Sequence, residues 1–146
     1  MPLVGGGGAG NVAGSNPTGT GNSLNYIGDH VHASSGSFAD TQSQATMLKF
    51  STQNAYIIGK FVFYGSTHTA QTAGSLTAGN TNNFQILIDN EVVGVVKTDT
   101  GQEDMPSEMK VPMLLPPNAR IEVKVISAGA AADYSTQATF VGRVYA

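Results

Sequence analysis

The feature that most constrains this fold is a series of short segments in which apolar and polar residues alternate. In residues 119–127, Ile121, Val123 and Val125 occupy every second position, and charged residues lie between them. Because successive side chains of a β-strand point to opposite faces, this alternation predicts a strand with one buried face. No segment repeats apolar residues at the three- to four-residue spacing of an amphipathic helix. The chain is therefore predicted to be all-β.

Turn-forming residues divide the chain into eight predicted strands, at residues 24–33, 46–51, 56–64, 84–89, 92–98, 108–115, 119–127 and 138–145. Asn90 and Glu91 are predicted to form a tight hairpin turn, because asparagine tolerates a positive φ. Pro116 and Pro117 end a strand, because proline cannot donate to the hydrogen-bond ladder. Longer loops are expected at residues 65–83, 99–107 and 129–133.

Eight short strands without a helix predict a sandwich of two β-sheets with jelly-roll topology. The alternative is an immunoglobulin-like sandwich, whose core commonly carries cysteine and tryptophan. This chain has neither residue. The alternation also assigns core positions in the remaining strands, to Ile57, Phe61, Phe63, Phe84, Ile86, Ile88, Met109, Val111, Met113, Leu115, Phe140 and Val144.

Residues 1–23 contain eight of the 18 glycines and no charged side chain. Such a segment buries too little apolar surface to fold by itself. It is expected to be an extended arm that precedes a sandwich domain of residues 24–146, and to gain order by lying on another protein surface. The residues expected to contact that partner are Met1, Pro2, Leu3, Val4, Val12 and Pro17.

The composition excludes several classes of function. A chain of 146 residues is long enough for one domain with its own core. It has no cysteine, which excludes disulfides and thiolate metal sites. The net charge is −3 and the seven basic residues are scattered, which argues against a nucleic-acid partner. No apolar run approaches the roughly 20 residues of a membrane span, so no membrane contact is expected.

Two histidines lie on one face of a predicted strand. His30 and His32 are separated by one residue, so both imidazoles point to the same side. This spacing can bind zinc or nickel, with His68 as a third ligand if its loop folds back. The alternatives are that the two imidazoles are solvated, that they pair across an interface, or that they form a ring near the axis of a trimer. The expectation is that no metal and no cofactor is bound.

Asp99, Glu103, Asp104 and Glu108 form an acidic stretch. Paired carboxylates can act as acid and base or bind calcium, but this spacing does not match an EF-hand loop. The alternative is an acidic loop that faces solvent or a partner. The glycines at 5–8 lack the lysine ending of a phosphate-binding loop. Neither a GxSxG motif nor a cysteine nucleophile occurs, so no catalytic residue is assigned.

The aromatic residues include five tyrosines that could line a sugar-binding face: Tyr26, Tyr56, Tyr64, Tyr134 and Tyr145. Tyr56 and Tyr64 have the same parity in one predicted strand, so they share a face. The alternative is that they are ordinary residues of a β-sandwich, where tyrosine is common.

Small jelly-roll proteins carried on the virions of tailed phages resemble this chain in their last strands, which correspond to VPMLLPPNARIEVKV and ATFVGRVY. Virion structural proteins of marine and cyanobacterial phages are also similar to MPLVGGGGAGNVAG, SLNYIGDHVHASSGSFA and TMLKFST. The resemblance covers most of the chain and rests on packing and turn features. It implies no catalytic residues. Such proteins include capsid decoration (cement) proteins, often trimeric, and the head domains of fibres or spikes.

The sequence is therefore interpreted as that of a capsid decoration protein on the outer surface of a virion, without enzymatic activity. Its expected partners are the major capsid protein and other copies of itself, as a homotrimer. Binding only to the assembled lattice would stabilise that lattice by mass action. The alternative is a receptor-binding or fibre-tip knob domain that recognises a host glycan. A small sugar-active enzyme is a second alternative, and it would require a cleft with paired carboxylates.

Overall fold

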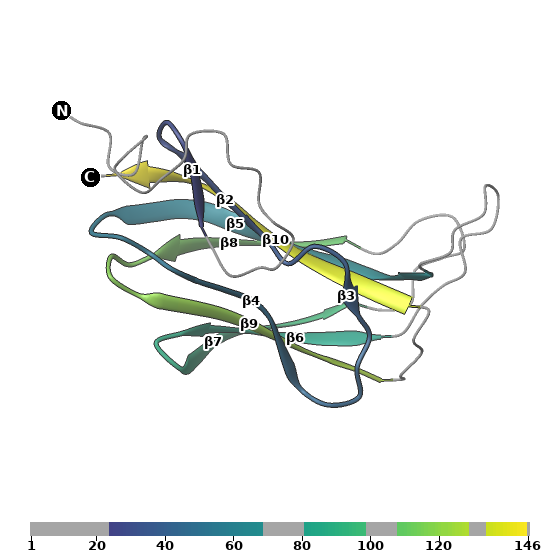
Figure 1. Cartoon of the computed structure of the whole chain (residues 1–146). Coiled ribbons are helices and arrows are strands. Elements are labelled where there is room, and N and C mark those ends of the chain that lie inside the picture. Colours follow the sequence, from purple (N-terminus) through teal and green to yellow (C-terminus); the bar gives the residue numbers. More distant parts are fainter. Residues whose placement is uncertain (1–23, 69–80, 99–107, 129–133, 146) are drawn as a thin grey trace.

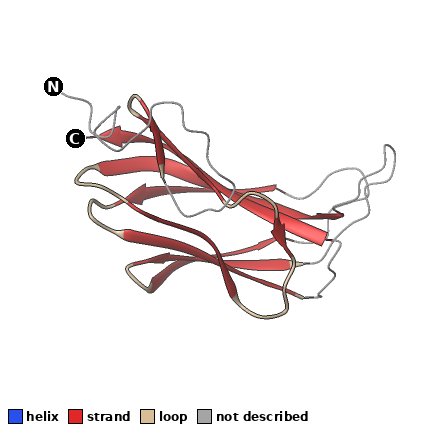
Figure 2. Ribbon diagram, in the orientation of Figure 1, coloured by secondary structure: helices blue, strands red, loops and turns tan. Residues whose placement is uncertain are grey.

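A computed structural model describes residues 24–68, 81–98, 108–128 and 134–145 of the chain. These residues form strands, turns and loops without any helix (Figure 2). Among them there is accordingly no helix long and apolar enough to cross a membrane. The predicted all-β sandwich is confirmed, because the strands pack as two antiparallel sheets, one above the other (Figure 1).

Sheet A has the strand order β1-β2-β10-β5-β8, and β3 also pairs with β10. Sheet B has the order β4-β9-β6-β7. The strands of the described residues are β1 (Asn25–Ile27), β2 (His30–Ser34), β3 (Phe38–Ala39), β4 (Ala45–Ser51), β5 (Tyr56–His68), β6 (Asn82–Ile88), β7 (Glu91–Thr98), β8 (Glu108–Leu115), β9 (Arg120–Ser127) and β10 (Tyr134–Tyr145).

The strand pairs are nested along the chain, which is the topology of a jelly roll. β6 pairs with β7, β5 with β8, β4 with β9 and β2 with β10. The chain thus behaves as one long ribbon folded at the β6–β7 hairpin and then wound around the core. Successive pairs alternate between the two sheets, so each sheet receives four of these eight strands. The predicted jelly-roll topology is confirmed.

The predicted first strand, at residues 24–33, is wrong in one respect. The structure divides it into β1 and β2, which pair through a turn at Gly28 and Asp29. Gly28 has a φ of 61°, a conformation that favours glycine. The buried positions change from even (Tyr26) to odd (Val31 and Ala33) across this turn. This change of parity was the signal that the prediction did not use.

The predicted hairpin turn at Asn90 and Glu91 lies one residue earlier in the structure. The turn residues are Asp89 and Asn90, with φ angles of 49° and 71°, and Glu91 already belongs to β7. Positive φ at both central residues defines the twist-matched turn of a two-residue hairpin, and Asp and Asn are among the residues that accept it. β5 and β10 are also longer than predicted, because the pairing between them continues to His68 and Tyr134.

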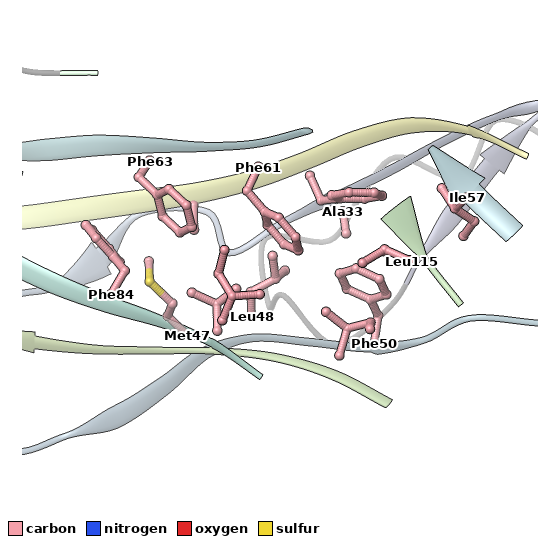
Figure 3. Close-up of a cluster of buried hydrophobic side chains, with 14 of the residues drawn as sticks. Ala33, Met47, Leu48, Phe50, Ile57, Phe61, Phe63, Phe84 and Leu115 are labelled. Atoms are coloured by element: carbon pink, nitrogen blue, oxygen red, sulfur yellow. The ribbon is translucent and has the colours of Figure 1, made fainter. Parts of the chain in front are cut away.

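The core lies between the sheets and consists of the inward positions of each strand. In Figure 3, Phe61 and Phe63 of sheet A point toward Met47, Leu48 and Phe84 of sheet B. The rings of Phe63 and Phe84 pack with their centroids 4.7 Å apart. Burying a phenylalanine contributes about 1.5–3 kcal/mol, so this cluster dominates the adhesion of the two sheets.

The predicted core positions are confirmed with one exception. Ile88, Val111, Met113 and Val144 are partly buried and pack against the core. Met109 is 45% exposed, although it has the inward parity. It lies near the start of β8, which has a strand neighbour on one side only, so few atoms are available to cover it.

Hydrogen-bonded side chains join the two sheets where β5 ends and β6 begins. Ser66 donates to Asp40 at 2.6 Å, and the Asn82 amide donates to Ser66. The Ser127 hydroxyl donates in turn to the Asn82 carbonyl oxygen. All four residues are buried. A connected polar network in a low-dielectric interior fixes geometry, so this end of the sandwich is held by directional bonds rather than by apolar contact.

Two glycines allow β5 and β10 to approach closely at the centre of sheet A. Gly59 and Gly142 are directly opposite each other in the register. A Cβ added at Gly59 would lie 2.3 Å from the Val141 carbonyl oxygen and 2.7 Å from the Phe140 ring. The inner side of the sheet therefore has no room for any side chain at Gly59.

We predict that Gly59→Ala destabilises the protein by about 1–3 kcal/mol or more, because the added methyl group meets backbone that cannot move aside. Gly94→Ala in β7 is the matched control, since its Cβ would lie 3.4 Å from the Ile86 side chain, an ordinary contact. The free energy of unfolding in denaturant measures both effects. Equal effects of the two substitutions would contradict this account of Gly59.

Candidate functional site

The candidate functional site is a groove on the outer face of sheet A, the face turned away from sheet B. Its volume is about 560 Å³, within the range of sites that hold small ligands or peptide side chains. It crosses β2, β10, β5 and β8 and is lined by His30, Val31, His32, Ile58, Gly59, Lys60, Pro112, Val141, Gly142 and Arg143.

Strand register places these residues side by side in two rows across the sheet. In the first row, Ile58 of β5 lies between Arg143 of β10 and Leu114 of β8. His30 of β2 continues this row beyond Arg143. All of these positions are outward, because their neighbours in sequence, such as Ile57, are buried in the core.

The second row lies one side-chain repeat further along the strands. Lys60 of β5 is flanked by Val141 of β10 and Pro112 of β8, and His32 of β2 follows Val141. The backbone of Gly59 and Gly142 lies between the two rows and also lines the groove.

Large apolar side chains are exposed in and beside the groove. Ile58, Leu114, Tyr56 and Tyr145 are 50%, 52%, 51% and 46% exposed. Tyr56 and Tyr145 are cross-strand partners, so their rings lie on adjacent strands of the same face. Contiguous apolar surface of this kind marks a contact site more often than single exposed residues do.

The charged groups around the groove are mainly basic. Lys60, Arg143, His30 and His32 line it, and none of the described residues that line it is acidic. The Arg143 guanidinium lies 5.8 Å from the centroid of the Tyr145 ring, within the distance of a cation–π contact. The site combines an apolar surface with basic groups, which suits an apolar ligand that carries negative charge.

Asp29 lies in the turn between β1 and β2, and its carboxylate binds the side chains of two of these basic residues, Arg143 and His30. One carboxylate oxygen lies 2.6 Å from Arg143 Nη2, and the other lies 2.8 Å from His30 Nδ1. Partial burial raises the pKa of Asp29. The charge and hydrogen bond of Arg143, together with His30, outweigh that effect and hold this pKa below its ordinary value of 3.8.

His30 and His32 lie on one face of β2, as predicted, and both line the groove, whereas the backbone of His68 is far from them. The backbone of His68 pairs with Tyr134, whereas that of His30 pairs with Arg143. Nine residues separate these two positions of β10, which corresponds to about 30 Å. The three-histidine metal site is therefore excluded by the strand register. In the described part of the chain, no group of three or more His, Asp or Glu residues is placed to hold a metal ion.

The tyrosines do not form one sugar-binding face. Tyr26 is buried in the core. Tyr56 and Tyr64 share the outer face, but eight residues of β5, about 26 Å, separate them. Tyr134 lies at the far end of β10, so only Tyr56 and Tyr145 come together.

The remaining predicted residues contribute less to this site. Glu108 is exposed and pairs with Lys110 at 2.7 Å. Asp99, Glu103 and Asp104 lie outside the described residues. The same holds for the predicted partner-binding residues Met1, Pro2, Leu3, Val4, Val12 and Pro17, and thus for the arm itself.

Sequence reasoning missed the groove residues Ile58, Lys60, Pro112 and Arg143, and Leu114 beside them. Strand parity was available as a signal, since Ile58 and Lys60 alternate with the core residues of their strand. Parity, however, shows only which residues of a single strand share a face. Which strands are neighbours, and in which register, required the tertiary structure.

No family model matches this chain, and no curated protein matches it. Similar solved structures include dimeric latent PorU from Porphyromonas gingivalis, with 11% identity over 74% of this chain and a TM-score of 0.42. Another is the VP2 subviral particle of infectious bursal disease virus, with 13% identity over 77% of this chain and a TM-score of 0.42. The matched regions are 10% and 30% of those two chains. Viral capsid proteins are thus among the structural neighbours, at a similarity too low to carry a functional argument.

We predict that Asp29→Asn destabilises the protein at pH 7 and does so less as the pH falls. The pKa of Asp29 is lower in the folded state, so the unfolded state binds its proton first as the solution is acidified. The stabilisation is present above pH 3.8, the unfolded value, and is lost as the pH falls through the lower folded value. Denaturant unfolding from pH 7 to about pH 3 measures this difference. The prediction is contradicted if Asp29→Asn lowers the free energy of unfolding by the same amount at every pH. It is also contradicted if the loss persists in a protein that already carries Arg143→Gln.

Proposed function

We propose that this chain is a structural protein of a virus particle, specifically a capsid decoration (cement) protein of the outer capsid surface. Its partners are the major capsid protein and further copies of the same chain, as a homotrimer, and its role is not enzymatic. The observation that carries the proposal is the apolar outer face of sheet A, where Tyr56, Ile58, Leu114 and Tyr145 are each about half exposed.

An apolar face of this kind is unfavourable in water and is typical of a surface that a partner covers. Its exposed side chains are not part of the hydrophobic core between the two sheets. The resemblance of the sequence to jelly-roll proteins of phage virions supports a partner within a virus particle.

Residues 1–23 provide the second contact in this proposal. An extended strand rises about 3.3 Å per residue, so 23 residues reach up to roughly 75 Å, beyond their own domain. An arm on a neighbouring subunit and a body on the lattice would together bind with avidity. Because the protein binds only assembled capsid, each bound copy shifts the equilibrium toward the intact lattice.

Deletion of residues 1–23 should leave a folded body that no longer occupies capsids, because the arm supplies contacts that the body lacks. Circular dichroism and thermal unfolding test the fold of the shortened protein, and co-sedimentation with particles that lack this protein tests binding. The full-length chain with Leu3→Ser and Val4→Ser is a milder variant, expected to bind more weakly. Normal occupancy by the shortened protein would contradict the role of the arm.

Virus particles that lack this protein should release their genome at lower temperature than complete particles, with adsorption to host cells unchanged. The physical reason is the loss of binding energy that favours the closed lattice. A dye that reports exposed nucleic acid during heating measures release, and depletion of free particles by cells measures adsorption. Unchanged heat stability together with impaired adsorption would overturn the cement function.

A second candidate function is a receptor-binding or fibre-tip knob that recognises a host glycan. One observation favours it: the pair of Tyr56 and Tyr145 lies beside the groove with Arg143 over one ring. Aromatic faces with a nearby polar group are suited to sugar rings. In that case free protein would compete with particles for cells, and Tyr56→Ala would abolish the competition.

A further inference from the structure

We propose that the groove of sheet A binds residues 99–107 of a second copy of this chain, so that copies join head to tail. The contact deepens the proposed function, because it specifies how the homotrimer of that proposal associates. This contact is tested by measuring self-association of the purified protein without capsids. A failure of self-association can therefore be distinguished from a failure of capsid binding.

The groove sets the chemistry of its ligand. Ile58, Pro112 and Val141 supply an apolar surface, and Lys60 and Arg143 supply positive charge beside it. The Asp29 carboxylate beside the groove pairs with Arg143 and His30, whereas Lys60 is exposed between Val141 and Pro112. A ligand with an apolar part and an acidic part matches this groove. The apolar part covers the apolar surface, and the carboxylates pair with the basic groups in a partly desolvated contact.

Residues 99–107 are the segment of this chain that matches those requirements. Their sequence is DTGQEDMPS, with acids at Asp99, Glu103 and Asp104 and no basic residue. Met105 and Pro106 follow directly and supply apolar surface. The other segments outside the described residues match poorly, because residues 1–23 and 69–80 carry no charged side chain and residues 129–133 carry a single acid.

The fold places the groove and the strand ends that flank this segment toward opposite ends of the sandwich. Residues 99–107 connect β7 to the start of β8 at Glu108, which lies opposite Tyr64. Leu114, beside the groove, is six residues further along β8, about 20 Å away. β8 runs between these two ends in Figure 1.

A contact between two different surfaces of identical chains is heterologous, and it forms a closed ring when the rotation between copies allows. In a ring of three copies, every groove holds the acidic segment of the neighbouring copy. Pro112 favours this side-chain contact over pairing of backbones along β8, because proline has no N–H to donate at this edge of the sheet.

The test uses charge reversal on the full-length chain. One variant carries Lys60→Glu in the groove, and another carries Glu103→Lys and Asp104→Lys. Each alone should weaken self-association at least about tenfold, because like charges then face each other across the contact. Lys124→Glu, on β9 of sheet B, is the matched control and should associate like the unchanged protein. Analytical ultracentrifugation over a concentration series measures association, and near-ultraviolet circular dichroism confirms folding.

A variant that carries all three substitutions decides the question. Its groove is acidic and its segment is basic, so opposite charges face each other again at every contact of a ring of three copies, and self-association should return. Its recovery also shows that the substitutions do not prevent folding. The proposal is overturned if the unchanged protein is a monomer, if either of the first two variants associates normally, or if the variant with all three substitutions is folded and does not associate.

Discussion

The pairing of β5 with β10 at the centre of sheet A is the constraint on which the rest of the structure depends. This single register places Phe61 and Phe140 together on the inner face, with their rings 4.7 Å apart. It also brings Ile58 and Arg143 together on the outer face. Because side chains alternate between faces, one register determines the core and the groove at once, and a shift by one residue would exchange them.

The two ends of the sandwich are held by different forces. Near the groove, sheet A depends on close backbone approach at Gly59 and Gly142, over a core of aromatic rings. Where β5 ends and β6 begins, the sheets are joined by buried hydrogen bonds through Ser66 and Asn82. Directional bonds near one end and a tight backbone contact near the other hold paired strands in register, and a contact surface on regular strands is positioned more precisely than one on loops.

Much of the fold followed from the sequence because a strand is a local object. The alternation of Ile121, Val123 and Val125 requires only that one face of a strand be buried, and the structure buries all three. The errors concerned the exact positions of turns. Gly28 and Asp29 formed a turn inside an apparently continuous strand, and the positive φ of Asp89 moved the β6–β7 turn by one residue. The buried residues change from an even position, Tyr26, to odd positions, Val31 and Ala33, across the first turn, so the sequence held a signal of that turn that the prediction did not use.

The sequence by itself determined the all-β class, the inward face of most strands, and the spacing of His30 and His32 on one face. Each of these properties depends on residues close together in the chain. Only the tertiary structure decided that Ile58, Arg143 and the two histidines share one groove, and that His68 is excluded from it. The physical reason is that hydrogen bonds between distant strands set their order and register. Residues far apart in sequence become neighbours only when the whole ribbon is wound around its core.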